Sequence, residues 1–121
     1  MLQLAAALAF LLGLAHSVLG ERYILTRLFR RDNLPELFGG TEFTTRTLRF
    51  AWHITTILWW GFAALLWLLG SGHSGAALTL SVIGYTSLAG GLLPLVITRG
   101  RHLSWLVLFV IGGIALSEAG T

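Results

Sequence analysis

Four long apolar runs dominate the sequence, at residues 2–20, 48–69, 76–98 and 103–117. A helix needs ~20 apolar residues to cross the ~30 Å hydrocarbon core of a bilayer, and the first three runs reach that length. The fourth is shorter and needs its flanking residues to complete a crossing. Single polar residues interrupt these runs without strand-like alternation. The pattern therefore predicts an all-α integral membrane protein, a four-helix transmembrane bundle forming one domain over residues 1–121.

The connection at residues 21–47 is amphipathic. Its first part, ERYILTRLFRR, continues a helical pattern, so the first helix is expected to extend beyond the membrane boundary. Asp32 and Asn33 are expected to break it and to start a short turn containing Pro35, which Gly39 and Gly40 end. Four apolar side chains in this connection suggest that it lies on the membrane surface: Leu34, Leu37, Phe38 and Phe43.

The arginines predict the orientation of the chain. All eight basic residues are arginines, and they lie only in the two connections at residues 21–47 and 99–102 or at their helix ends. Positively charged residues stay on the cytoplasmic side. Both termini are therefore expected on the periplasmic side of a bacterial cytoplasmic membrane. The first run has no positive region before it, so we expect it to remain as an anchor and not to be cleaved as a signal peptide.

Composition supports a membrane protein and removes several kinds of chemistry. Hydrophobic residues make up 55% of the 121 residues and charged residues 11%, whereas soluble domains carry about 25% charged residues. The net charge of +3 lies beside membrane spans, so no nucleic-acid partner is expected. The arginines can pair with anionic lipid headgroups, but the positive-inside rule already accounts for them. The chain has no cysteine, which excludes disulfides and thiolate ligands.

Two histidines interrupt the first two apolar runs at matching depth. His16 lies six residues before Arg22, and His53 lies four residues after Arg49. At 1.5 Å per residue each histidine is roughly 6–9 Å inward from its arginine, and the two helices run antiparallel. Gly13 and Gly20 share the face of His16 and are expected to clear space above and below its ring. Glu21 and Arg22 mark the boundary of the first run, and Glu21 is a candidate partner of Arg49.

Three interpretations of these residues stay open. The polar cluster of His16, His53, Glu21 and Arg49 can be structural, with hydrogen bonds that join two helices. His16 would then bond to Thr55, Thr56 or Ser17, and Glu21 to Arg49. The two imidazoles can instead be axial ligands of haem b, with room for the porphyrin at Gly13 and Gly20, or ligands of a metal ion. The histidines can also handle protons in a transporter of protons or small solutes, which would need an oligomer to complete a path.

Two segments carry a resemblance. HSVLGER at residues 16–22 and LRFAWHITT at residues 48–56 resemble a family of small four-span bacterial membrane proteins without an established activity. The resemblance implies topology and a bacterial origin, and no chemistry. It places His16, Glu21, Arg22, Arg49 and His53 at the motif positions.

A non-enzymatic role is the leading expectation from the sequence. No nucleotide-binding, nucleophile-elbow or metalloprotease motif is present. We expect a small membrane subunit or accessory protein that contacts the lipid bilayer and either a partner membrane protein or further copies of itself. The remaining histidines, His73 and His102, are expected to be solvated at the membrane surfaces.

Overall fold

The computed structural model describes residues 1–121 and contains helices and connecting loops. The first helical segment is continuous and consists of α1 (Leu2–Leu19), the π-helix η1 (Gly20–Leu25) and α2 (Thr26–Leu28). Three further helices follow: α3 (Glu42–Gly70), α4 (Ala76–Ile97) and α5 (Ser104–Ala119). The predicted all-α class with four main helices is confirmed, and the first helix extends beyond residue 20 as expected.

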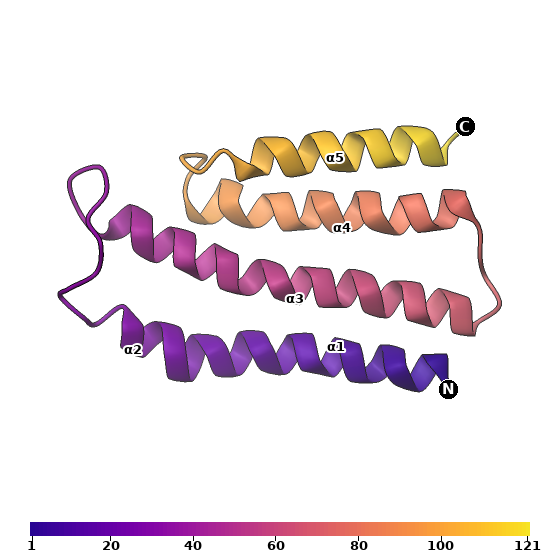
Figure 1. The fold of residues 1–121 in the computed structure, drawn as a ribbon, viewed down its shortest axis with the longest axis horizontal. Helices are drawn as coiled ribbons and strands as arrows, with labels where there is room; N and C mark the ends of the chain where they lie inside the picture. Colours follow the sequence, from indigo (N-terminus) through magenta and orange to yellow (C-terminus); the bar gives the residue numbers. More distant parts are fainter.

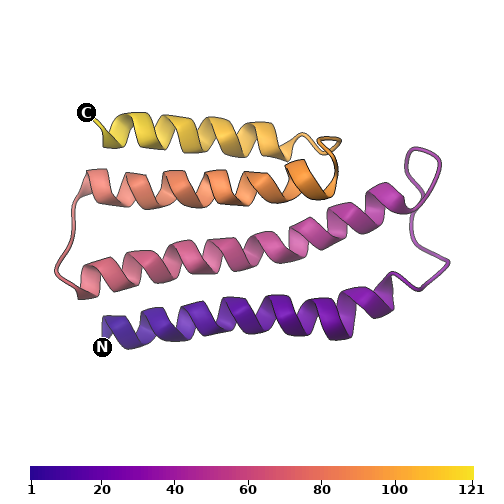
Figure 2. The ribbon, with the colours of Figure 1, turned by 180° about the vertical axis from the view of Figure 1, so that it is seen from behind.

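Three of these helices are long and apolar enough to cross a membrane: Leu2–Leu28, Glu42–Gly70 and Ala76–Ile97. The fourth, α5, is apolar but has only 16 residues. It runs antiparallel to α4 along most of its length (Figure 1). Both chain termini lie at one end of the molecule, and the two arginine-bearing connections lie at the other (Figures 1 and 2).

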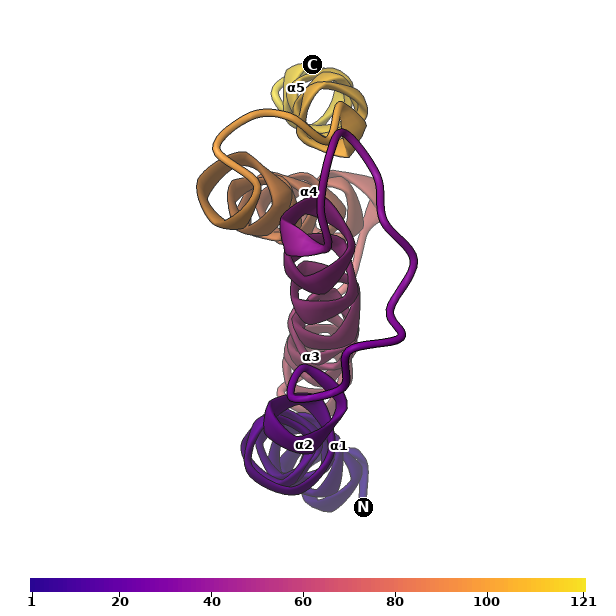
Figure 3. The same cartoon turned by 90° about the vertical axis from the view of Figure 1, so that its left-hand side faces the viewer.

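The helices form a single row. Each packs only against its neighbours in sequence, α1 on α3, α3 on α4 and α4 on α5. Viewed along the helices, the four follow one another without a second layer (Figure 3). The first and last helices do not meet to close a bundle, so both broad faces of the row are open.

Glycines allow close approach within this row. A Cβ atom added to Gly84 would lie 2.6 Å from Cγ of Leu116, and one added to Gly112 would lie 2.7 Å from Cδ2 of Leu88. Gly61 of α3 similarly faces Thr86 of α4. Helix association in lipid relies on such close packing at small residues. The row is therefore held by direct backbone approach between α4 and α5, where no polar cluster exists.

The connection between α2 and α3 departs from prediction in one detail. No helical turn forms around Pro35; instead, the backbone N–H of Leu37 donates to the carbonyl of Gly40 at 2.9 Å and closes a tight turn.

His102 also differs from the expectation that it is solvated. Its half-buried ring packs edge-on against Phe50, with ring centroids 4.8 Å apart.

Candidate functional site

A cluster of polar side chains joins the first helical segment to α3 near the arginine-rich end. Here the term α1–α3 polar cluster denotes five residues: Ser17, Glu21, Arg49, His53 and Thr56. Ser17 and Glu21 are four residues apart, as are Arg49 and His53, so each pair lies on one face of its helix. These two faces meet, and hydrogen bonds connect all five side chains.

Glu21 is the acceptor at the rim of the cluster. Nη2 of Arg49 lies 2.9 Å from Oε1 of Glu21, and Nε of Arg49 donates to Oε2 at 3.2 Å. Nε2 of His53 lies 3.1 Å from the same Oε2. This two-pronged arginine–carboxylate geometry is stronger and more directional than a single contact. The predicted pairing of Glu21 with Arg49 is therefore confirmed.

Glu21 lies within the π-helix η1. The backbone N–H of Thr26 donates to the carbonyl of Glu21, five residues back, so the helix is wider here than an α-helix. Regular α-helical spacing rotates Glu21 about 140° from His16, so the two do not share a face. Because Glu21 is turned away from His16, it lies on the same face as Ser17 and contacts His53.

A chain of hydrogen bonds runs from Glu21 toward the middle of the molecule. Nδ1 of His53 lies 2.7 Å from Oγ of Ser17, and that oxygen lies 2.7 Å from Oγ1 of Thr56. Thr56, which is buried, donates to the carbonyl of Gly13 at 3.1 Å. A hydroxyl has one proton to give. Thr56 must therefore accept from Ser17, Ser17 must accept from His53, and Nδ1 of His53 carries a proton.

His16 belongs to a neighbouring contact and not to this chain. Its ring stacks on the indole of Trp52, with centroids 4.6 Å apart and planes 5° apart. Nε1 of Trp52 donates to the carbonyl of His16 at 3.0 Å, and the carbonyl of Trp52 accepts from Nε2 of His16 at 3.3 Å. His16 and His53 thus have different partners: Nε2 of His16 bonds to α3, whereas both nitrogens of His53 are used within the cluster.

The space predicted beside the two glycines is filled by tryptophan. A Cβ atom added to Gly20 would lie 2.0 Å from Nε1 of Trp52, and one added to Gly13 would lie 3.1 Å from Nε1 of Trp60. The expectation that Gly13 and Gly20 leave room for a porphyrin is therefore wrong. Their missing side chains instead let the indole rings pack directly on the backbone of the first helix.

Arg22 lies outside the cluster. Its guanidinium lies 5.5 Å from the ring centre of Tyr23, and that of Arg27 lies 6.0 Å from the same ring. Nor does the chain contain any group of three or more His, Cys, Asp or Glu side chains that could hold a metal ion. The motif positions named from the sequence thus separate into the pair His16–Trp52, the cluster, and Arg22 on its aromatic neighbour.

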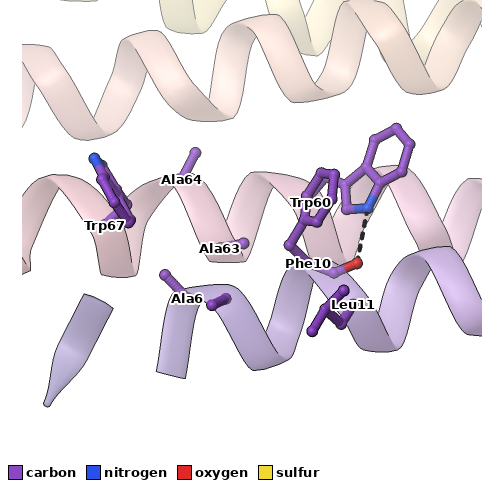
Figure 4. A pocket seen from close by; sticks show the side chains of 8 residues that line it. Ala6, Phe10, Leu11, Trp60, Ala63, Ala64 and Trp67 are labelled. Atoms are coloured by element: carbon purple, nitrogen blue, oxygen red, sulfur yellow. Dashed lines mark hydrogen bonds between the residues drawn. The ribbon is translucent and has the colours of Figure 1, made fainter. Parts of the chain in front are cut away.

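Beyond the cluster, the contact between α1 and α3 is apolar. A groove of about 500 Å³ between the two helices is lined by eight hydrophobic residues: Ala6, Ala7, Phe10, Leu11, Trp60, Ala63, Ala64 and Trp67. All of them except Ala7 are labelled in Figure 4. Trp60 stacks on Phe10 at 5.2 Å and donates from Nε1 to the Phe10 carbonyl at 3.2 Å (Figure 4). The polar path from Glu21 therefore ends at Gly13.

Ser17 and Thr56, expected as partners of His16, instead form a chain with His53, and Trp52 was not predicted as the partner of His16. A usable signal existed, because Ser17 and Glu21 are four apart and Thr56 follows His53 by three. Comparisons of the chain with protein-family models, with curated proteins and with solved structures give no match. The functional argument therefore rests on the geometry described above.

Proposed function

We propose that this protein is a small multi-pass membrane protein that acts as a non-enzymatic subunit or accessory protein, in which the α1–α3 polar cluster fastens the first helix to the rest of the row. One observation carries the role of the cluster. Its side chains bond to one another and to a backbone carbonyl, so their polar groups are used between helices. Such interhelical hydrogen bonds contribute on average ~0.6 kcal/mol each in membranes.

The proposed orientation places both termini in the periplasm of a bacterium. All eight arginines lie toward the end formed by the α2–α3 loop and the α4–α5 turn, opposite the termini (Figure 1). Four carboxylates accompany them there, Glu21, Asp32, Glu36 and Glu42, which leaves an excess of positive charge. The positive-inside rule assigns that end to the cytoplasm.

Tyr85 supports a role in a larger assembly. It lies near the middle of α4, and 66% of it is exposed. Thr79 and Ser81 of the same helix satisfy their hydroxyls by donating to the carbonyls of Gly75 and Ala77, but the Tyr85 hydroxyl has no hydrogen-bond partner within the chain. A hydroxyl left without a partner in hydrocarbon costs roughly 2–7 kcal/mol. A neighbouring protein segment at this face would remove that cost.

The two other interpretations have less support. Haem ligation by the two histidines lacks open space beside Gly13 and Gly20, and both ring nitrogens of His53 are already hydrogen-bonded. A transport path would need polar groups along its length, whereas the groove between α1 and α3 beyond Gly13 is lined by hydrophobic residues. The accessory role accounts for the same residues and needs neither a haem cavity nor a polar path through the protein.

The absence of native cysteine allows a direct test of orientation. Single cysteines replace Asn33, in the α2–α3 loop, and Ser71, in the α3–α4 loop, and intact cells are treated with a membrane-impermeant thiol reagent. The proposal expects labelling at position 71 before lysis and at position 33 only after lysis. The reverse order, or labelling of both positions before lysis, would contradict it.

The assembly role is tested at Tyr85 by crosslinking in native membranes. A photoreactive amino acid replaces Tyr85, and the matched control replaces Val110, which lies mid-helix on α5 and is 54% exposed. The proposal expects a discrete protein adduct from position 85 and mainly lipid adducts from position 110. Lipid adducts alone from both positions would argue against a partner at this face.

A further inference from the structure

The arginines at the loop end fall into two groups. Four have partners within the chain: Arg46 pairs with Glu42, Arg49 pairs with Glu21, and Arg22 and Arg27 lie over Tyr23. The other four have no carboxylate within 4 Å: Arg30, Arg31, Arg99 and Arg101. Orientation by the positive-inside rule depends on the number of arginines and not on their partners. The distinction between the groups therefore raises a separate question about the unpaired arginines.

The α2–α3 loop presents one aromatic side chain to its surroundings. Phe38 is 85% exposed and has a φ of 57°, followed by Gly39 with a φ of 89°. Positive φ is unusual for a bulky residue such as phenylalanine and costs energy. The Leu37–Gly40 hydrogen bond closes the turn around it. The turn thus holds a large apolar ring away from the protein at a backbone cost.

A series of contacts between aromatic rings holds this turn beside the α4–α5 turn. Phe38 packs edge-on against Phe43 at 5.0 Å, and Phe43 stacks on His102 at 6.1 Å. His102 in turn packs against the buried Phe50. Figure 3 shows the loop following one side of the row as far as the start of α5. The exposed ring is thereby brought to the segment that carries Arg99 and Arg101.

An open hollow of about 390 Å³ lies between these two turns, and Phe38 and Arg101 line it. Arg99, also exposed, is two residues from Arg101 in the same turn. Asp32 and Glu36 lie in the loop as well, but neither is within 4 Å of an arginine. The hollow thus has a cationic side chain, Arg101, on one wall and an apolar side chain, Phe38, on another. It lies at one end of the row of apolar helices.

We propose that Phe38 and Arg101 form a binding site for the headgroup of an anionic phospholipid. The guanidinium of Arg101 takes the phosphate, Arg99 adds a second positive charge, and the Phe38 ring lies among the glycerol and upper acyl carbons. Charge complementarity favours this occupant, because each arginine near an anionic membrane surface contributes ~1 kcal/mol. The site rests on the proposed function only in that this end must lie at a membrane surface.

Native mass spectrometry tests this site. The full chain in detergent is mixed with equal amounts of phosphatidylglycerol and phosphatidylcholine, and the lipid that remains bound after release from the detergent is identified. Wild type should retain phosphatidylglycerol preferentially, and Arg101→Gln should reduce that retention roughly fivefold. Arg27→Gln removes the same charge from the Tyr23 contact and should leave retention unchanged. Phe38→Ser, which alters an exposed side chain, should weaken retention of both lipids.

The outcomes separate a built lipid site from general attraction. Equal losses in Arg27→Gln and Arg101→Gln would overturn the proposal, as would displacement of the bound lipid by excess inorganic phosphate, which would indicate a simple anion site. Unchanged retention in Phe38→Ser would also overturn it. Because this measurement does not depend on the direction of insertion, its result is independent of the cysteine-labelling test of orientation.

Discussion

Trp52 and His16 hold each other through both their rings and their backbones. The two rings are nearly parallel and stack with their centroids 4.6 Å apart, and each ring donates to the backbone carbonyl of the other residue. The contact joins the first helix to α3 one turn from the polar cluster. A histidine that looks like a candidate ligand in the sequence is thus explained by a tryptophan on the neighbouring helix.

Replacing Trp52 should weaken the contact between α1 and α3. Trp52→Phe removes the N–H donor and part of the stacking surface, and we expect the free energy of unfolding in detergent to fall by about 1–2 kcal/mol. Trp67→Phe is the control, because Trp67 is 53% exposed and its indole N–H has no partner within the chain. Denaturant titration followed by circular dichroism measures both. Similar losses in the two variants would contradict the assigned role of Trp52.

Gly20 should tolerate no side chain. Gly20→Ala places a Cβ atom 2.0 Å from Nε1 of Trp52, so the indole must move and its stack on His16 must break. Overpacking of this kind costs about 1–3 kcal/mol, and tryptophan fluorescence should change as well. Gly113→Ala is the matched control, since nothing lies within 4 Å of its added Cβ. It should be neutral or stabilising by up to about 1 kcal/mol. Equal stability of the two variants would show that Trp52 does not occupy this position.

The hydrogen-bond order predicts that Nδ1 of His53 carries a proton. ¹⁵N spectra of histidine-labelled protein, with the signal assigned by its loss in His53→Gln, should show a proton on Nδ1. Thr56→Val removes the donor to Gly13 and frees the Ser17 hydroxyl to donate to His53, so the proton on Nδ1 should be partly lost. Thr56→Ser retains the donor and should resemble wild type. An unprotonated Nδ1 in wild type would contradict the proposed order.

The purified protein should have no haem spectrum. Indole rings fill the space beside Gly13 and Gly20, and both nitrogens of His53 are hydrogen-bonded, so added haemin should give no sharp Soret band. The measurement is an absorption spectrum before and after reduction with dithionite. A redox-sensitive band present in wild type and lost in both His16→Ala and His53→Ala would restore the ligation interpretation.

The sequence predicted the elements that depend on composition along the chain. The four helices, the extension of the first helix and the pairing of Glu21 with Arg49 follow from apolar length, helical continuity and opposite charge at matching depth. These features need no knowledge of how one helix rotates against another. Hydrophobicity alone also identifies three helices as long enough for a membrane.

The remaining contacts depend on rotation and spacing between helices, which no single segment specifies. A glycine beside a histidine permits close approach, but the approaching group can be a porphyrin or an indole, and here it is the indole of Trp52. The π-helix at Gly20–Leu25 has no clear signal in the local sequence. Similarly, four apolar helices can close into a bundle or form a row, and the packing of Gly84 against α5 contributes to the row observed here.

The claim that the cluster fastens α1 to α3 is tested most directly by a double-mutant cycle on Ser17 and His53, whose side chains lie 2.7 Å apart. Unfolding free energies of Ser17→Ala, His53→Ala and the double variant should give a coupling of about 0.5–1.5 kcal/mol. The control cycle replaces Ser17→Ala with Ser81→Ala, because Ser81 bonds only to its own helix at Ala77, and its effects should add. Additive effects for Ser17 and His53, within about 0.3 kcal/mol, would contradict the proposed interhelical role.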